Sequence, residues 1–263
     1  MGNKTKIDWC DSTWNPVTGC LHGCEYCYAR KIAERFGANQ MPIFADYPVL
    51  HEPVRCTDTY AYMRDAGIST GKIQPYPFGF LPTFHRYKLD EPKHWKKPRN
   101  IFVCSMADMF GEWVPDEWIE QVFAACDAAP WHRYLFLTKN PKRYVDLYAK
   151  NILPIGKRYW YGTTVTTPEQ PFFYSRVPDD NPHTFVSIEP IMGSFGKIKN
   201  RPDWVIVGAE TGNRKGKVAP CKEWIDEIAD ECKRCRTPIF MKESLRDLMG
   251  ADFRQEFPWE EKQ

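Results

Sequence analysis

The feature that most constrains the fold is a series of short apolar runs in the second part of the chain. The runs cover 101–104, 134–137, 159–165, 184–188, 204–207 and 238–241. Short continuous apolar runs predict strands buried on both faces, as in a parallel sheet. Helical patterns alternate with several of these runs, over 116–129, 141–150 and 222–234. Alternating strands and helices predict an α/β protein.

We expect about six to seven parallel strands, counting one near the N-terminus at 6–9 or 14–17. Such a series forms a partial or complete (β/α) barrel, and a doubly wound sheet is the alternative. A chain of 263 residues is long enough for a single domain over 1–263. An irregular segment rich in aromatic, proline and basic residues interrupts it at about 38–99, with a short helix expected near 57–66.

Composition excludes several classes of protein. The formal net charge is +2, so no global field attracts nucleic acid or a membrane surface. No apolar run approaches the roughly 20 residues of a membrane span, and the N-terminus lacks the apolar region of a signal peptide. We therefore expect a cytoplasmic protein without membrane contact. Ten cysteines in such a protein favour metal or redox chemistry over a disulfide framework.

Three of the cysteines, Cys20, Cys24 and Cys27, lie close together with the spacing Cys-x3-Cys-x2-Cys. Three thiolates at this spacing can ligate three of the four irons of one [4Fe-4S] cluster, which leaves the fourth iron open to a small-molecule chelator. A helical pattern over 28–36 follows directly and ends at Gly37. The free amides at a helix N-terminus suit an anionic cluster.

Two alternatives exist for these cysteines. A structural zinc site needs a fourth ligand, and the nearest candidate, His22, lies inside the loop, where chelation beside both flanking cysteines is sterically awkward. Inert buried thiols are the other alternative, although the loop is rich in polar residues. A second metal site at Cys221, Cys232 and Cys235 competes with the commoner explanation of small buried thiols.

Polar residues or glycine follow nearly every predicted strand. In (β/α) barrels the functional residues lie where strands end at their carboxyl edge. The candidates, in chain order, are Ser105, Asp108, Lys139, Thr164, Thr166, Glu189, Gly208 and Glu210. A strand often ends in a polar residue simply because the chain meets water there. Their recurrence at one edge nevertheless predicts a site.

The cysteine spacing resembles the signature of radical S-adenosylmethionine (SAM) enzymes. A longer series of motifs resembles an uncharacterised phage-associated family, a domain of unknown function with a radical SAM-like core. These motifs are Trp-Asn-Pro-Val-Thr-Gly-Cys, Cys-x2-Cys-Tyr-Ala, Ser-Met-Ala-Asp, Leu-Thr-Lys-Asn-Pro, Ser-Ile-Glu-Pro and Trp-Val-Ile-Val-Gly-Ala-Glu-Thr-Gly, between about residues 7 and 245. The chain departs from many members in its shorter gap between the first two cysteines. The resemblance implies a barrel of the radical SAM type with a [4Fe-4S] cluster and SAM as cofactors.

The resemblance also implies roles for individual residues. Cys20, Cys24 and Cys27 would ligate the cluster, and the backbone around Tyr26 would face the SAM adenine. Ser105 and Asp108 would contact the SAM amino group, although the Gly-Gly-Glu usual at that place is absent. Lys139 would bind the SAM carboxylate or a substrate anion, and Thr164 and Thr166 would bind the ribose or a carboxylate. Glu189 and Glu210 would accept hydrogen bonds from ribose hydroxyls or orient the substrate. Gly208 would let the backbone approach the adenine closely.

The implied function is reductive cleavage of SAM followed by hydrogen abstraction from a substrate. An external flavodoxin- or ferredoxin-like protein would supply the electron. The phage association, together with the aromatic and basic segments at 86–88 and 95–99, favours a nucleic acid base or nucleotide as the substrate. A peptide and a small metabolite are the alternative substrates, and a proline-rich loop packed on the core is the alternative explanation of the region 38–99. Two rival functions exist: a non-catalytic module that uses zinc or a cluster to support nucleic-acid or protein binding, and a cluster-bearing redox sensor.

Overall fold

The computed structural model describes residues 5–37, 46–55, 72–171, 183–196 and 201–260. The chain divides into two compact units. The first, which we call the sheet unit, comprises Met1–Thr13, Lys97–Val103 and Pro130–Gln263. The second, the loop unit, comprises Trp14–Lys96 and Cys104–Ala129. The expected organisation as one domain stays a prediction.

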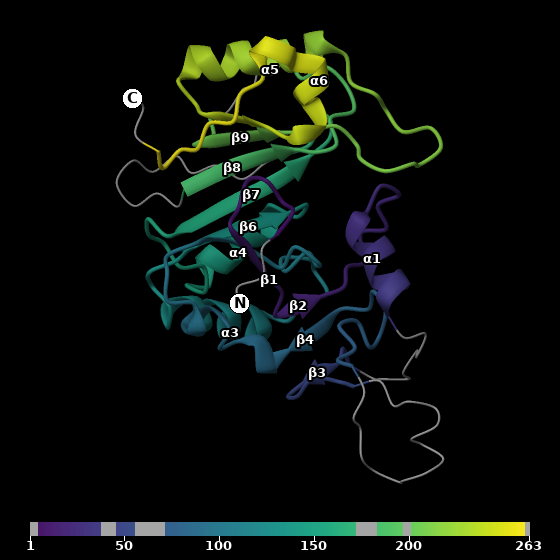
Figure 1. The fold of residues 1–263 in the computed structure, drawn as a ribbon. Helices are drawn as coiled ribbons and strands as arrows, with labels where there is room; N and C mark the ends of the chain where they lie inside the picture. Colours follow the sequence, from purple (N-terminus) through teal and green to yellow (C-terminus); the bar gives the residue numbers. More distant parts are fainter. Residues whose placement is uncertain (1–4, 38–45, 56–71, 172–182, 197–200, 261–263) are drawn as a thin grey trace. The chain divides into compact units, whose positions relative to one another are not determined.

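A seven-stranded parallel sheet that curls into half of a barrel forms the framework of the sheet unit (Figure 1). Its strands run in the order β1 (Ser12–Trp14), β5 (Asn100–Val103), β6 (Arg133–Thr138), β7 (Tyr159–Val165), β8 (His183–Ile188), β9 (Trp204–Val207) and β10 (Ile239–Met241). Each strand from β5 onward pairs with the next in the chain, whereas a doubly wound sheet reverses direction at a switch point. The prediction of a partial barrel with six to seven parallel strands is confirmed.

The two faces of this sheet bury different side chains, as β9 illustrates. Val205 and Val207 belong to an aliphatic cluster that also includes Ile225 and Ile228 of α5 (Lys222–Cys235). The alternate residue Trp204 belongs to an aromatic cluster on the other face. Side chains alternate between the faces of a strand, so burial on both faces requires a continuously apolar sequence. The short apolar runs therefore follow from this arrangement.

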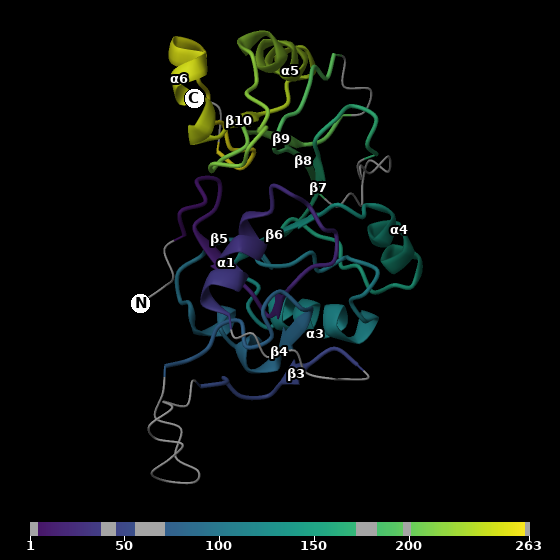
Figure 2. The same ribbon diagram turned by 90° about the vertical axis from the view of Figure 1, so that its right-hand side faces the viewer.

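Helices connect several of the strands. Those of the described residues are α1 (Tyr28–Phe36), α3 (Asp116–Asp127), α4 (Lys142–Ala149), α5 and α6 (Arg246–Met249), with 3₁₀ turns at Arg86–Lys88, Pro92–His94, Glu243–Leu245 and Gly250–Asp252. The helices predicted over 28–36, 116–129, 141–150 and 222–234 are confirmed to within two residues at each end. Figure 2 shows α5 and α6 beside β9 and β10 in the sheet unit. None of the described helices has the length and apolar character needed to cross a membrane.

The prediction for the first strand was partly wrong. Residues 6–9 form no strand, and Trp9 instead packs in the aromatic cluster. The region 14–17 divides into β1, which ends at Trp14, and β2 (Val17–Thr18), which belongs to another sheet. Pro16 lies between them and has no amide hydrogen to continue a ladder. The helix expected near 57–66 lies outside the described residues.

A small sheet organises the loop unit. It contains β2, β4 (Thr83–His85) and β3 (Val49–Leu50), with β4 in the middle. Strand β4 pairs antiparallel with β2 and parallel with β3. Its central residue Phe84 stacks on Trp118 of α3, with ring centroids 5.2 Å apart. The described part of the segment 38–99 thus holds two short strands and two 3₁₀ turns.

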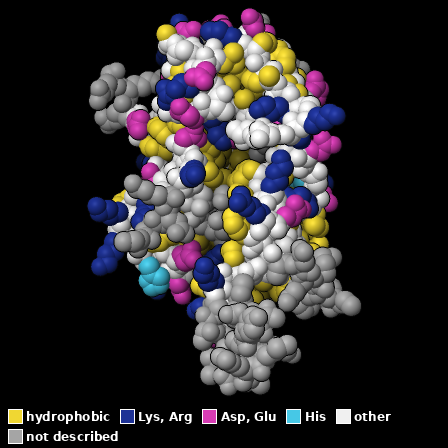
Figure 3. All heavy atoms as spheres, turned by 45° about the vertical axis from the view of Figure 1, so that its right-hand side comes forward, with side chains coloured by type: hydrophobic (Ala, Val, Ile, Leu, Met, Phe, Trp, Pro, Cys, Tyr) yellow, Lys and Arg dark blue, Asp and Glu magenta, His cyan; other side chains and the backbone are white. Residues whose placement is uncertain are grey.

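Charged side chains of both signs are mixed on the surface. On the face drawn in Figure 3, Lys and Arg side chains alternate with Asp and Glu. This mixture agrees with the net charge of +2. Any anion-binding site on this protein must therefore come from a local grouping of cations.

His85 makes the loop unit sensitive to acid. It is fully buried in β4, and its Nε2 lies 2.8 Å from Thr18 Oγ1. Burial, together with the nearby charge of Lys88, lowers the pKa of His85 to about 3. Unfolded histidine titrates near pH 6.5, so between these two values the unfolded chain binds a proton that the folded chain excludes. Stability should therefore fall as the pH falls through this window, by about 1.4 kcal/mol per pH unit.

Urea unfolding at pH 7 and at pH 5 tests this prediction. The wild-type chain should lose more stability between the two pH values than a His85→Gln variant, which has no titrating ring. The variant is expected to be less stable at pH 7 because it disturbs a buried contact, so the comparison concerns only the pH dependence. Equal pH dependence in both proteins would show that His85 is not the group responsible.

Candidate functional site

The three predicted cluster ligands lie on the segment 18–30, here called the cysteine loop, which joins β2 to α1. Hydrogen bonds of the backbone fix its first part. The amide of Gly19 donates to the Met106 carbonyl at 2.9 Å, and the amide of Cys20 donates to the Phe80 carbonyl at 3.2 Å. The guanidinium of Arg30 closes the loop by donating to the Cys20 carbonyl at 3.2 Å. The position of the first cysteine is therefore set by the backbone.

Gly19 should be indispensable to this arrangement. Its φ is +88°, and a Cβ at this position would lie 2.2 Å from the Leu81 carbonyl oxygen, which is backbone and cannot move aside easily. Gly23 in the same loop also has a positive φ, of +69°, but a Cβ there meets no atom within 4 Å. We expect Gly19→Ala to cost more than about 2 kcal/mol and Gly23→Ala about 1 kcal/mol, because only Gly19→Ala adds a clash to the left-handed backbone. Urea unfolding of both variants checks the difference, and equal losses would contradict it.

The three thiols are partly exposed, and the amide of Arg30 donates to Cys27 Sγ at 3.4 Å, so Cys27 caps α1. Tyr26, also partly buried, precedes Cys27. Burial raises the pKa of Cys20 to about 12, and the charges of Asp108, Cys27 and Cys24 act in the same direction, against a backbone hydrogen bond. Cys20 is therefore protonated at neutral pH, and a metal that binds there must displace the proton.

Ser105 and Asp108 contact residues of the cysteine loop, and their predicted role toward SAM stays a prediction. Ser105 Oγ donates to Asn15 Oδ1 at 3.1 Å, and the same oxygen accepts the amide of Met106. Asp108 is buried, and its Oδ2 lies 2.7 Å from Nε2 of His22 in the loop. The carboxylate and the hydroxyl thus lie in the same unit as the three thiols.

Two residues at this site were not assigned a role from the sequence. His22 was considered only as a zinc ligand, whereas its ring pairs with Asp108 and meets Trp113 edge to face, with centroids 4.9 Å apart. The hydroxyl of Tyr28, at the start of α1, donates to the Ser105 carbonyl at 2.6 Å. Both partners are far away in the sequence, so no local pattern identifies these contacts.

The donor set of the loop fits an iron–sulfur cluster. Soft thiolate ligands suit such clusters. Among the described residues, no three His, Cys, Asp or Glu side chains are grouped so as to hold a single metal ion. A four-iron cube does not need such convergence, because each thiolate binds its own iron.

The other predicted site residues belong to the sheet unit and follow the carboxyl ends of its strands. Lys139 follows β6, and Thr164 and Thr166 lie at the end of β7. The amide and hydroxyl of Thr166 both donate to Gln170 Oε1, at 2.6 and 3.1 Å. The site residues named from the sequence are therefore divided between the two units.

Both predicted carboxylates of the sheet unit have basic partners. Glu189, after β8, forms an ion pair with Lys242, which directly follows β10. Glu210 is buried and accepts two hydrogen bonds from Arg214, at 2.7 and 2.8 Å. The absence of a side chain at Gly208 leaves room for Lys242, because a Cβ there would lie 2.9 Å from its Cδ. No role was assigned to Lys242 or Arg214 from the sequence, although the position of Lys242 directly after a predicted strand was a usable signal.

A joint metal site at Cys221, Cys232 and Cys235 is ruled out by helix geometry. Cys221 directly precedes α5, whereas Cys232 and Cys235 lie in its last turn. At 1.5 Å of rise per residue, Cys221 and Cys232 are about 17 Å apart along the helix axis. Cys232 is buried in the aliphatic cluster, and burial raises its pKa to about 12. The commoner explanation, a small buried thiol, applies to Cys232.

Comparison with known proteins identifies a family but no function. No curated protein and no solved structure matches the chain. The family described as "Protein of unknown function (DUF5131)" matches residues 4–246. The resemblance to a domain of unknown function is thereby confirmed, while the phage association and the radical SAM relationship stay predictions. Because the match covers nearly the whole chain, this protein belongs to the DUF5131 family.

Proposed function

We propose that this protein is a radical SAM enzyme that acts on a nucleic acid base or nucleotide. The observation that carries the proposal is the cysteine loop: three partly exposed thiols in the spacing Cys-x3-Cys-x2-Cys, on a backbone fixed by hydrogen bonds. When bound there, a [4Fe-4S] cluster would supply the electron that cleaves SAM into methionine and a 5′-deoxyadenosyl radical, which abstracts hydrogen from the substrate.

The residues of the loop unit have definite tasks in this proposal. Cys20, Cys24 and Cys27 hold the cluster, and the amides in the first turn of α1 offset its negative charge. Asp108 is buried and acidic, so its carboxylate suits the amino group of SAM. His22 holds that carboxylate in place through the 2.7 Å contact. Asn15 does the same for Ser105.

The substrate and the electron donor are less closely specified. The basic and aromatic segments at 86–88 and 95–99 support a nucleic acid base or nucleotide. The cluster needs an external one-electron donor, for which a flavodoxin- or ferredoxin-like protein is the expected partner. A phage origin of the family would agree with a substrate of this class.

Anaerobic reconstitution with iron and sulfide tests the proposal directly. The reconstituted protein should be brown and, with dithionite and SAM, should form 5′-deoxyadenosine detectable by mass spectrometry. A colourless protein that holds one zinc ion would support the rival reading as a metal-supported binding module. A brown protein that binds no SAM would support the redox sensor instead.

A further inference from the structure

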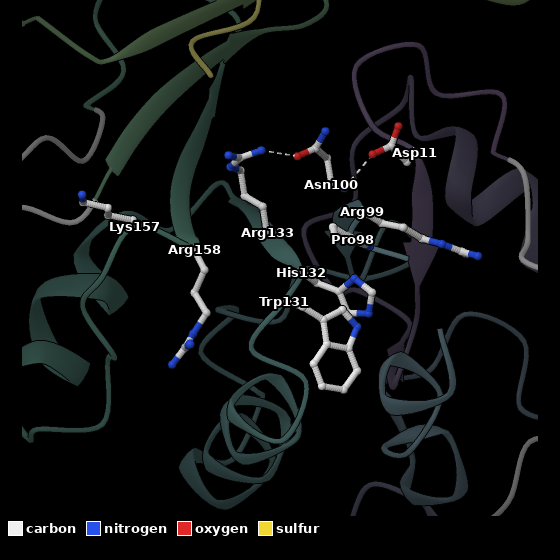
Figure 4. Close-up of a pocket in the computed structure, with 9 residues that line it drawn as sticks. All are labelled: Asp11, Pro98, Arg99, Asn100, Trp131, His132, Arg133, Lys157 and Arg158. Atoms are coloured by element: carbon white, nitrogen blue, oxygen red, sulfur yellow. Dashed lines mark hydrogen bonds between the residues drawn. The ribbon is translucent and has the colours of Figure 1, made fainter. Parts of the chain in front are cut away.

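A pocket in the sheet unit lies outside the site described above. It has a volume of about 380 Å³, and its lining includes Asp11, Arg99, Trp131, Arg133, Lys157 and Arg158 (Figure 4). Asn100 and Arg133 are the first residues of β5 and β6, and Arg158 directly precedes β7. The strands are parallel, so these residues lie at the amino edge of the sheet. The candidate residues of the sheet unit follow its carboxyl edge, which is the usual place for chemistry in barrels.

The lining of this pocket is basic. It contains three arginines and one lysine, and Asp11 is the one acidic side chain among the described residues that line it. One oxygen of Asp11 accepts the amide of Asn100 at 2.7 Å. Arg133 and Lys157 also lie near His183, the first residue of β8, whose pKa is lowered by burial and by these two cations, against the opposite effect of Asp203. The grouping is a local cationic site on a protein with little net charge.

Aromatic side chains accompany these cations. Trp131 lines the pocket and is 41 % exposed, which is unusual for a tryptophan in this otherwise well-buried sheet unit. The half-buried guanidinium of Arg133 lies over the ring of Trp259, 4.4 Å from its centroid. This contact and a hydrogen bond to Asn100 Oδ1 fix the position of the Arg133 side chain. A fixed cation and an exposed ring thus lie in one pocket.

The positions of the charges indicate the kind of anion. A single phosphate is best held by donors that converge on one point. In Figure 4 the head groups of Arg133 and Arg158 instead lie apart from each other, and that of Arg99 points away from Trp131, where it donates to the buried Ser12 Oγ at 3.0 Å. Separated cations suit a ligand with several separated negative charges. Single-stranded nucleic acid has this character, and its bases stack on exposed aromatic rings.

We propose that this pocket, at the amino edge of β5, β6 and β7, binds a single strand of nucleic acid, with the phosphates at Arg133, Arg158 and Lys157 and a base on Trp131. The proposal concerns binding alone and does not depend on radical chemistry. The nucleic acid would bind at the amino edge of the sheet, whereas the site residues predicted in the sheet unit lie at its carboxyl edge.

Fluorescence anisotropy of the full chain with a labelled strand of about ten nucleotides tests the proposal, because single-strand sites cover 4–16 nucleotides. A deoxyribose strand and a ribose strand are titrated separately, and binding of either supports the site. The logarithm of the association constant should fall linearly with the logarithm of salt concentration, with a slope of about −2 for about three neutralised phosphates.

Two variants separate the ionic and the stacking contributions. Lys157→Gln should reduce the salt slope by about 0.7, because one phosphate contact is lost. Trp131→Ala should weaken binding about tenfold without changing the slope, because stacking involves no counterion. Both side chains are exposed, so neither change should disturb folding. The matched control is Lys233→Gln, an exposed lysine on α5 outside the pocket, which should leave binding unchanged.

Several outcomes would overturn the proposal. These are no binding of either strand, equal effects of Lys157→Gln and Lys233→Gln, or full displacement of the strand by polyglutamate at the same charge concentration. A Cys24→Ala variant should bind the strand as tightly as the wild type. This last comparison separates a failure of the pocket from a failure of the radical SAM proposal.

Discussion

Replacing Cys24 with alanine should abolish both cluster assembly and SAM cleavage. Cys24 is the central thiol of the loop, so its loss leaves two ligands for a cluster that needs three. After anaerobic reconstitution, the variant should contain little iron and sulfide and should form no 5′-deoxyadenosine above background. Iron and sulfide analysis and mass spectrometry of the reaction mixture measure the two effects separately.

Cys221→Ala is the matched control for this experiment. Cys221 is exposed and lies at the start of α5, outside the cysteine loop. Its replacement should leave the iron content and the yield of 5′-deoxyadenosine unchanged. Full activity of Cys24→Ala would contradict the proposed function, provided that both variants melt at the wild-type temperature. Cys24 is only partly buried, so we expect them to do so.

Replacing Trp204 with alanine should cause the largest loss of stability in the sheet unit. Trp204 is fully buried at the start of β9, and its ring meets Trp9, Phe185 and Phe240 at centroid distances of 6.3, 5.7 and 6.1 Å. Its Nε1 also donates to the Glu256 carbonyl at 2.9 Å. Truncating a buried tryptophan leaves a large cavity and typically costs about 3–5 kcal/mol. The melting temperature should fall by on the order of 10 °C.

Trp131→Ala provides the comparison, because it removes the same side chain from an exposed position in the same unit. It should cost less than about 1 kcal/mol. Trp204→Phe should lie between the two, since it keeps most of the packing but leaves the Glu256 carbonyl without this donor. Urea unfolding of the three variants ranks their losses in the free energy of unfolding. A loss for Trp204→Ala as small as that for Trp131→Ala would show that the aromatic cluster repacks around the cavity.

The aromatic cluster joins parts of the chain that are far apart in sequence. Trp9 comes from the N-terminal segment, and Phe257 and Trp259 come from the C-terminal segment. Both segments pack against Trp204, with centroid distances of 5.9 Å for Phe257 and 5.1 Å for Trp259. Trp259 also contacts Arg133 at the basic pocket. The core of the sheet unit therefore supports the pocket at its amino edge.

Much of the fold was predictable because its signals are local. The strand β7 and the helix α1 have the predicted boundaries, since a run of apolar residues and a 3.6-residue period are properties of neighbouring residues. The order of the strands in the sheet was also predictable, because each strand from β5 onward pairs with the next in the chain. The first strands were placed less well, because β1 and β2 are too short to show a pattern and join different sheets.

The cysteine spacing is likewise a local property, so the order of the residues is enough to place three thiols in one loop and to predict the helix that follows it. The partners of the polar groups, in contrast, became known from the folded chain. His22 meets Asp108 across 86 residues, and Lys242 meets Glu189 across 53. The basic pocket collects residues from four separate parts of the chain. Such contacts depend on how strands pair, and a side chain carries no signal of which distant residue the completed sheet will place beside it.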